Sequence, residues 1–105
     1  MKNIKLILCF DLDETITLPG QGIGKEAWMT RKPNLKTLEL MNLAKQKGHK
    51  IIIHTSRLSS ESAVVTLQWL QKYNVPYDAI HFNKPFYDYV CDDRNKTIEE
   101  LKDLL

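Results

Sequence analysis

Short apolar runs separated by polar turns divide the chain into expected strands and helices. Lys5–Phe10 and Lys50–His54 are almost continuously apolar, which is typical of strands buried on both faces of a parallel sheet. Ala79–Phe82 and Tyr87–Cys91 are two further short runs that we predict as strands. The pattern therefore predicts four strands.

Three segments carry the apolar spacing and the end signals of helices. Pro33 opens the first helix, which ends before Gly48 and has an apolar side formed by Leu35, Leu38, Met41 and Leu43. Ser59 or Ser60 caps a second helix, with apolar positions Ala63, Val64, Leu67 and Leu70. Thr97-Ile98-Glu99-Glu100 matches a capping box and starts a last short helix.

This alternation of strands and helices argues for an α/β domain with a mostly parallel sheet. The 105 residues suit a single domain, 1–105, with one hydrophobic core. A composition of 43% hydrophobic and 27% charged residues excludes disorder, collagen and coiled coil as whole-chain structures. The apolar runs are too short to cross a bilayer, so we expect no membrane partner.

Net charge and cysteines add little to this picture. The net charge of +2, from 15 basic and 13 acidic residues, neither requires nor excludes a nucleic-acid partner. Cys9 and Cys91 lie inside apolar runs, so we interpret them as buried free thiols in a reducing cytosol. The first apolar run also ends too early for a signal peptide. We therefore expect a cytoplasmic protein.

Reactive side chains follow each of the four expected strands. They are, in chain order, Asp11 and Asp13, then Thr55, Ser56 and Arg57, then Lys84, and finally Asp92 and Asp93. Ligands of parallel α/β sheets bind beyond the carboxyl ends of the strands. Titratable groups that converge there mark function, so we expect one shared site.

Clustered carboxylates beside one lysine favour a hard divalent cation, because uncompensated carboxylates would repel one another. Mg²⁺ prefers oxygen ligands and binds phosphate oxygens, so we expect Mg²⁺ as the cofactor. The histidines His49, His54 and His81 are scattered and lack zinc spacing. We interpret His54 as a core or helix-packing histidine, because it alternates with Thr55.

Four motifs in order resemble those of the haloacid dehalogenase (HAD) superfamily of phosphohydrolases. They are Asp11-Leu12-Asp13-Glu14-Thr15, the apolar strand Ile51–Thr55, Lys84 in Asn83-Lys84-Pro85, and Tyr89–Asp93 with its paired acids. The sequence departs from the family at Glu14, where many members have glycine. Only twelve residues follow Asp93, and no cap domain is inserted.

The resemblance implies a minimal Rossmann-like three-layer sandwich with a four-stranded sheet in the order 4-1-2-3. It also implies a flap hairpin over about residues 16–32. The short capless form is similar to small phosphatases associated with capsular polysaccharide biosynthesis. Phage-type polynucleotide 3′-phosphatase domains are similar too, and share the run Asp92–Arg94.

The family mechanism assigns roles to individual residues. Asp11 would be the nucleophile that forms an aspartyl-phosphate, and Asp13 the general acid and base. Thr55 and Lys84 would contact the phosphoryl group. Apart from the family mechanism, Ser56, Arg57 and Arg31 are candidates to bind substrate, Arg57 because it follows Thr55 by two residues, although a solvated basic turn explains Arg31 equally well. The metal ligands would be Asp11, Asp13, Asp92 and Asp93, and the division between the last two stays open.

We therefore expect a Mg²⁺-dependent phosphatase that acts on a small phosphorylated metabolite such as a sugar phosphate. A nucleic-acid 3′-end phosphatase is the alternative, less favoured because the lysines are dispersed rather than aligned. A phospho-acceptor receiver and a binding module without turnover are further alternatives. A capless site suits a large substrate, or a small one enclosed by oligomerisation.

Overall fold

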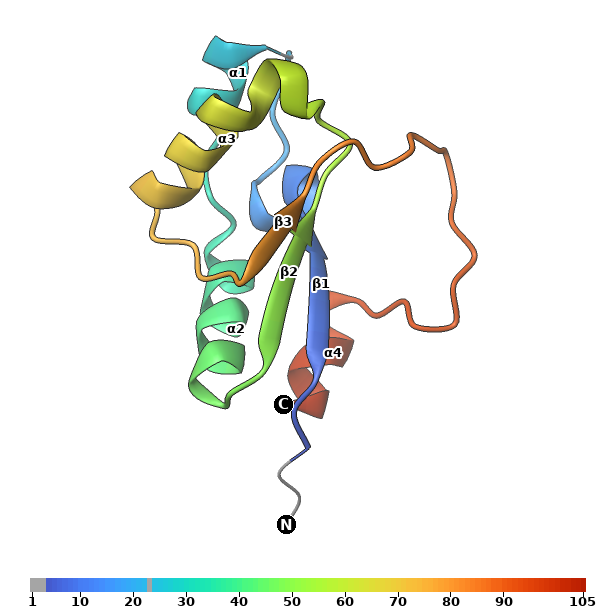
Figure 1. Cartoon of the computed structure of the whole chain (residues 1–105). Helices are drawn as coiled ribbons and strands as arrows, with labels where there is room; N and C mark the ends of the chain where they lie inside the picture. Colours follow the sequence, from blue (N-terminus) through green and yellow to red (C-terminus); the bar gives the residue numbers. More distant parts are fainter. Residues whose placement is uncertain (1–3, 23) are drawn as a thin grey trace.

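Figure 1 shows a computed structural model, which describes residues 4–22 and 24–105. Residues 1–3 of the expected domain and Ile23 of the expected flap lie outside the described residues. The sheet contains β1 (Ile7–Asp11), β2 (Lys50–His54) and β3 (Ala79–His81), all parallel and in the order β1-β2-β3. Their carboxyl ends therefore meet at one edge.

In the described part of the chain, four α-helices connect and follow the strands, and β1 continues into a tight turn, η1 (Leu12–Ile16). The helices are α1 (Lys25–Met29), α2 (Leu35–Gln46), α3 (Ser59–Lys72) and α4 (Ile98–Leu104). The side chain of Asn34 caps α2, and Thr97 forms the expected capping box of α4 with Glu100. Among the described helices, none is long and apolar enough to cross a membrane.

The hydrophobic core lies between one face of the sheet and the helices. Leu8, Phe10, Ile51 and Ile53 alternate along β1 and β2 and are buried. They pack against side chains of α2 and α3, chiefly Leu40, Met41, Trp69 and Leu70. Full burial of one such side chain contributes about 1.5–3 kcal/mol to folding, so this layer supplies most of the stabilisation.

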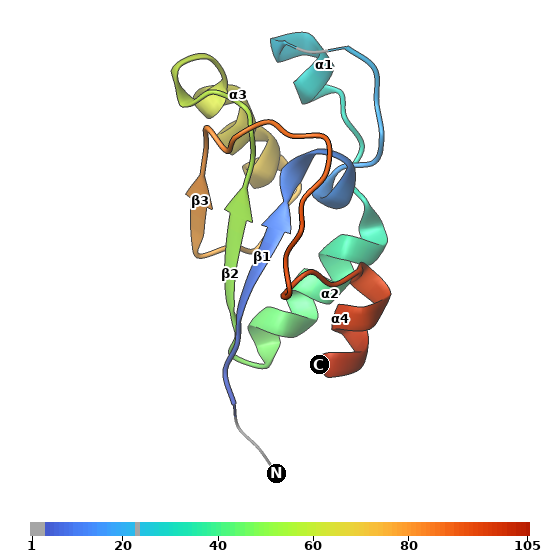
Figure 2. The same ribbon diagram turned by 90° about the vertical axis from the view of Figure 1, so that its right-hand side faces the viewer.

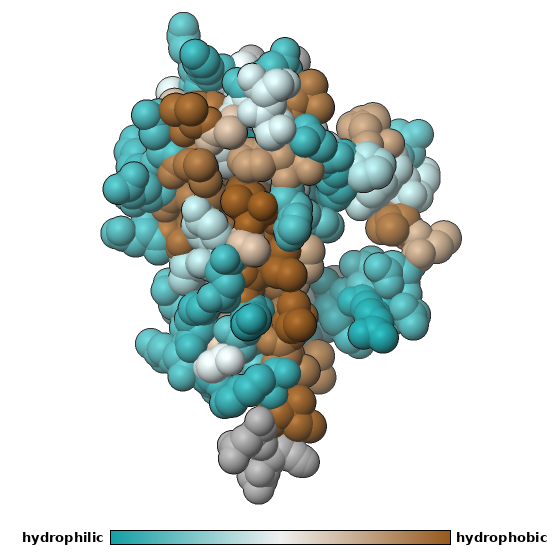
Figure 3. Space-filling model, viewed as in Figure 1, coloured by the Kyte–Doolittle hydropathy of each residue, from teal (hydrophilic) through white to brown (hydrophobic). Residues whose placement is uncertain are grey.

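The opposite face of the sheet carries no helix within the described residues, because α1, α2 and α3 lie on the other side of the strands (Figure 1) and α4 lies beyond the edge of β1 (Figure 2). Ile7 is 68% exposed, Cys9 is exposed and Ile52 is half-buried. Figure 3 shows apolar side chains as a column over the strands. The described residues thus form two layers rather than the expected three. Cys9 and Cys91 are free but exposed, so their expected burial is wrong.

The fourth strand is not formed in the structure. Tyr87–Cys91 lies in the connection from β3 to α4, which swings away from the sheet (Figure 1), and Tyr89 is 92% exposed. Within the described residues, β1 pairs only with β2, so its outer edge is open. A five-residue run that includes Asp88 buries little apolar area to offset the entropy lost on ordering it. Of the expected strand order 4-1-2-3, the sheet therefore contains only the order 1-2-3.

Helix α3 is correctly expected, and Leu70 is buried as expected, but the rest of the buried face differs from the expected one. Val64 is 70% exposed and Leu67 is exposed, whereas the other buried positions are Ser62, Val65, Thr66 and Trp69. The short helix α1 packs against α3, and Thr66 bonds to the side chain of Arg57. Because Thr66 has a polar partner in Arg57, its hydroxyl side chain can lie on the buried face of α3. The spacing of apolar residues alone therefore does not identify the whole buried face.

At the opposite end of the sheet from the strand carboxyl ends, Asp78 joins α2 to β2. Its carboxylate accepts hydrogen bonds from Lys45 Nζ at 2.7 Å and from the backbone N–H of Ile51 at 2.8 Å. The Lys45 bond, followed by the Ile51 bond, holds the pKa of Asp78 below its ordinary value of 3.8. The stabilisation is therefore present above pH 3.8 and is lost as the pH falls through the lower native pKa.

We predict that Asp78→Asn lowers the midpoint of urea denaturation at pH 7, and that the difference from the wild type shrinks as the pH falls below 3.8. Asp103→Asn, which changes an exposed carboxylate on α4, is the control and should leave both midpoints unchanged. If the two denaturation midpoints differed by the same amount at neutral and at acid pH, the predicted link between stability and ionisation of Asp78 would be wrong.

Candidate active site

Asp11 ends β1 and meets a lysine from the far end of the chain. Its Oδ1 accepts a hydrogen bond from the backbone N–H of Leu12 at 3.0 Å and lies 3.2 Å from Lys84 Nζ. Lys84 is mostly buried, whereas the Asp11 side chain is 41% exposed. The arrangement therefore presents a solvent-accessible carboxylate beside a fixed positive charge.

The chain turns sharply after β3 to place Lys84. Asn83 has φ 64°, a left-handed conformation that asparagine adopts more readily than most residues. Its N–H donates to the Arg57 carbonyl at 2.9 Å, and the Lys84 N–H donates to the Thr55 carbonyl at 2.9 Å. The Asn83 side chain also accepts from the N–H of Ser59, the first residue of α3. Two backbone bonds and a helix cap thus hold Lys84 next to the end of β2.

The turn η1 sets the direction of Asp13. Asp13 is extended and Glu14 has φ 64°, with the Glu14 N–H donating to Thr17 Oγ1 at 3.0 Å. A left-handed residue favours glycine, which is the residue that many proteins with this motif have here. Glu14 therefore adopts a backbone conformation that glycine adopts more readily.

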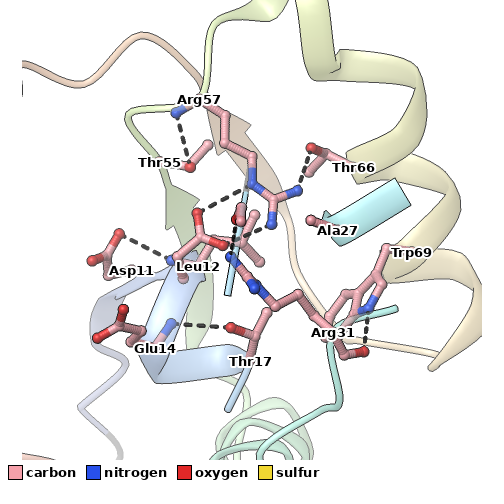
Figure 4. Close-up of polar contacts among 12 residues, drawn as sticks. Asp11, Leu12, Glu14, Thr17, Ala27, Arg31, Thr55, Arg57, Thr66 and Trp69 are labelled. Carbon is pink, nitrogen blue, oxygen red and sulfur yellow. Dashed lines mark hydrogen bonds and ion pairs between the residues drawn. The ribbon is translucent and has the colours of Figure 1, made fainter. Parts of the chain in front are cut away.

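Arg57 holds Asp13 through both carboxylate oxygens (Figure 4). Its Nη2 lies 2.7 Å from Asp13 Oδ1, and its Nε donates to Asp13 Oδ2 at 3.1 Å. The third donor, Nη1, bonds to Thr66 Oγ1 at 2.9 Å, and the Trp28 ring lies 4.7 Å from the guanidinium carbon. The side chain of Arg57, expected to bind substrate, is thus enclosed by protein.

Thr55 and Ser56 follow β2 as expected. Thr55 is buried, and its Oγ1 accepts a hydrogen bond from the Arg57 N–H at 3.1 Å. Ser56 is exposed beside it. The hydroxyl of Thr55 therefore braces the backbone that carries Arg57.

A cavity of about 710 Å³ opens between β1 and the β3–α4 connection. Its polar lining includes Asp11, His54, Lys84, Asp92 and Arg94. His54 faces this cavity on the uncovered side of the sheet, level with Asp11, so its expected packing in the core or against a helix is wrong. Burial, and next the charge of Lys84, lowers the pKa of His54, which favours its neutral form.

The paired acids of the last motif are not gathered around Asp11. Asp92 lines the cavity and accepts a hydrogen bond from the Arg94 N–H at 2.9 Å, whereas Asp93 is exposed and is not among the lining residues. Within residues 4–22 and 24–105, no three His, Cys, Asp or Glu side chains are grouped so as to hold a metal ion. The oxygen donors suit Mg²⁺ by their chemistry, but their spacing here does not form its site.

The segment expected as a flap is closed at its base. Thr17 forms an antiparallel bridge with Pro33, and the Leu18 N–H donates to the Lys32 carbonyl at 2.8 Å. Between them the chain forms α1 rather than a simple hairpin. The Arg31 guanidinium donates to the carbonyls of Gln21 and Gly22, and Trp69 Nε1 donates to the Arg31 carbonyl at 2.9 Å. Arg31 thus closes this loop through its side chain and ties it to α3 through its backbone.

Trp28 and Thr66 lie at the site but are not among the candidate site residues predicted from the sequence. Both contact Arg57. An aromatic residue within a glycine-bounded segment was the available signal for Trp28, but its partner lies 29 positions away and shares no local pattern with it.

No family model and no curated protein matches the sequence. Among solved structures, a structural-genomics target from Vibrio cholerae is similar, with a TM-score of 0.80 and 26% identity over 94% of this chain and 88% of that one. A chain of a Pnkp1/Rnl/Hen1 complex has a TM-score of 0.65 and 25% identity over 95% of this chain. A chain of the Pnkp1/Rnl/Hen1 RNA repair complex has a TM-score of 0.63 and 22% identity over 95% of this chain.

The present chain corresponds to 33% and 30% of those last two chains, so it matches a part of each. The similarity extends over nearly all of the present chain. It supports the α/β fold with its parallel sheet.

We predict that Asp13→Ala destabilises the fold more than Asp11→Asn. The first change leaves the buried Arg57 guanidinium without its carboxylate, which costs about 1–3 kcal/mol. The second weakens a more exposed pair, worth less than about 1 kcal/mol. Urea denaturation of both variants measures the difference, and equal losses would contradict the structural role of the Arg57–Asp13 pair.

Proposed function

We propose that the chain is a phosphatase of the HAD type, which hydrolyses a phosphomonoester through an aspartyl-phosphate on Asp11. The observation that carries the proposal is the accessible Asp11 carboxylate 3.2 Å from Lys84, at the strand ends. Asp13 stands two residues further on, in a fixed orientation. A nucleophile, a cation and a second acid are what this reaction needs.

In the first half-reaction, an Asp11 oxygen attacks phosphorus and the bond from phosphorus to the leaving oxygen breaks. Asp13, in its protonated form, gives its proton to that oxygen, so an alcohol leaves. Lys84 offsets negative charge on the phosphoryl oxygens. Thr55 and Ser56, at the end of β2, supply hydroxyl donors for the same oxygens.

In the second half-reaction, water attacks the phosphorus of the aspartyl-phosphate. Asp13, now a carboxylate, accepts a proton from that water, and the bond from phosphorus to the Asp11 oxygen breaks. Phosphate leaves, and both acids return to their starting states. One residue thus serves as acid and then as base, which requires that its carboxyl group stay close to the reacting oxygen throughout.

We propose Mg²⁺ as the cofactor, which Asp11, Asp92, Asp93 and the backbone carbonyl of Asp13 would hold once pairing of Tyr87–Cys91 with β1 brings the paired acids to the strand ends. When bound, Mg²⁺ supplies positive charge to the phosphoryl oxygens. The oxygen-only donor set supports this choice. We also propose that Tyr87–Cys91 forms the fourth strand on the open edge of β1, which is supported by the unpaired edge and by the strand pattern of that run.

The proposed substrate is a small phosphorylated metabolite such as a sugar phosphate. A nucleic-acid 3′ end is the second candidate. The similarity to chains of an RNA repair complex favours it.

We predict that the purified protein hydrolyses p-nitrophenyl phosphate in the presence of Mg²⁺ and that excess chelator abolishes the activity. Asp11→Asn should abolish turnover while the circular dichroism spectrum stays that of the wild type, because the nucleophile is lost and the fold is kept. Lys45→Gln, at the other end of the sheet, is the control and should retain full activity. Turnover by Asp11→Asn near the wild-type rate would show that Asp11 is not the nucleophile.

We predict that kcat/KM is higher for sugar phosphates than for oligonucleotide 3′-phosphates in a matched panel. Affinity for a single-stranded oligonucleotide, measured at 50 and 200 mM salt, provides a second test, because phosphate contacts make affinity strongly salt-dependent. Absent or salt-insensitive binding supports the small-molecule substrate. Tight, salt-sensitive binding together with faster 3′-phosphate release would instead favour the nucleic-acid substrate.

A further inference from the structure

The side chain of Arg57 is enclosed by other residues of the protein. Its side chain is 4% exposed, and three of its five N–H groups are directed to Asp13 and Thr66. The Trp28 ring covers the guanidinium at 4.7 Å, a distance typical of a cation–π contact. An arginine that grips a substrate phosphate needs its planar fork directed to solvent or to the cavity, and Arg57 is not among the residues that line the cavity.

The residues that hold Arg57 come from separate parts of the chain. Asp13 lies in η1, Thr66 in α3 and Trp28 in α1, the helix of the flap segment. The backbone of Arg57 is braced as well, because its N–H donates to Thr55 Oγ1 and its carbonyl accepts from Asn83. The guanidinium is therefore fixed before any substrate arrives.

We propose that Arg57 is a positioning residue that orients Asp13 for proton transfer, and that Trp28 in turn holds Arg57. The inference rests on the proposed phosphatase function. Two parallel hydrogen bonds fix both the position and the plane of a carboxylate, whereas one bond leaves it free to rotate. Each carboxylate oxygen has a second lone pair, so Asp13 can exchange a proton with a leaving oxygen or a water. Arg57 itself exchanges no proton.

The test separates orientation of Asp13 from binding of substrate. Under single-turnover conditions, release of the leaving group reports only the first half-reaction. A p-nitrophenolate leaves without being protonated, whereas an alkoxide from glycerol phosphate needs the proton of Asp13. Arg57→Lys keeps the charge but loses the bidentate contact. We expect it to slow glycerol phosphate cleavage about thirtyfold and p-nitrophenyl phosphate cleavage less than about threefold, with unchanged half-saturating concentrations.

A double-mutant cycle provides the second measurement. In an Asp13→Asn background, Arg57→Lys should add almost no further loss, because the group that it positions no longer transfers a proton. Lys45→Gln is again the control in both assays. Thermal denaturation of each variant shows whether it is folded at the assay temperature.

The outcomes distinguish the inference from the proposed function. If the wild type cleaves neither substrate, the phosphatase function fails, and the inference fails with it. If the wild type is active but Arg57→Lys raises the half-saturating concentration of both substrates, Arg57 binds substrate and the inference alone is overturned. Equal rate losses for both leaving groups, or additive losses in the cycle, overturn it as well.

Substitutions of Trp28 provide a further test, which does not depend on whether the Arg57→Lys variant folds. Trp28→Phe keeps an aromatic face over the guanidinium and should change neither rate by more than about twofold, whereas Trp28→Leu removes the cation–π contact. We expect Trp28→Leu to slow glycerol phosphate cleavage by about three- to tenfold while sparing p-nitrophenyl phosphate. A Trp28→Leu enzyme that cleaves both substrates at the wild-type rate would refute the supporting role of the flap.

Discussion

The parallel register of three strands is the constraint on which the site depends. Asp11 and His54 are level across β1 and β2, and His81 continues the same row on β3. Because the strands run in one direction, each chain segment leaves the sheet at the same edge. The residues that follow the strands are then held by short backbone bonds, such as those from Asn83 to Arg57 and from Lys84 to Thr55. A shift of one residue in this register would direct these side chains to the other face.

Burial on only one side of the sheet explains several other features. The helices pack on Leu8, Phe10, Ile51 and Ile53, so the alternate side chains of the same strands face a cavity and solvent. The uncovered side holds both Asp11 and the histidine next to it, and it is also where Cys9 is exposed. The helix-covered face of the sheet therefore supplies stability, and the uncovered face supplies an accessible surface with reactive side chains.

The strands β1, β2 and β3, the helices α2, α3 and α4, and the approach of Lys84 to Asp11 could all be predicted from the sequence. Buried strands and capping boxes depend on neighbouring residues, so their signals are local. The contacts of Arg57 with Trp28 and Thr66 could not be predicted, because no periodic pattern in the sequence connects these residues. The Tyr87–Cys91 run has a strand pattern, but pairing with β1 requires closure of a long connection, which a local pattern does not report.

Asn83 performs two tasks that few side chains combine. Its backbone is left-handed, which turns the chain toward Lys84, and its amide group caps the first turn of α3. Glycine would accept the same backbone but has no group to cap the helix, while serine and threonine could cap it but adopt that backbone reluctantly. A loop residue that contacts neither Asp11 nor Asp13 thereby determines where the Lys84 ammonium group can lie.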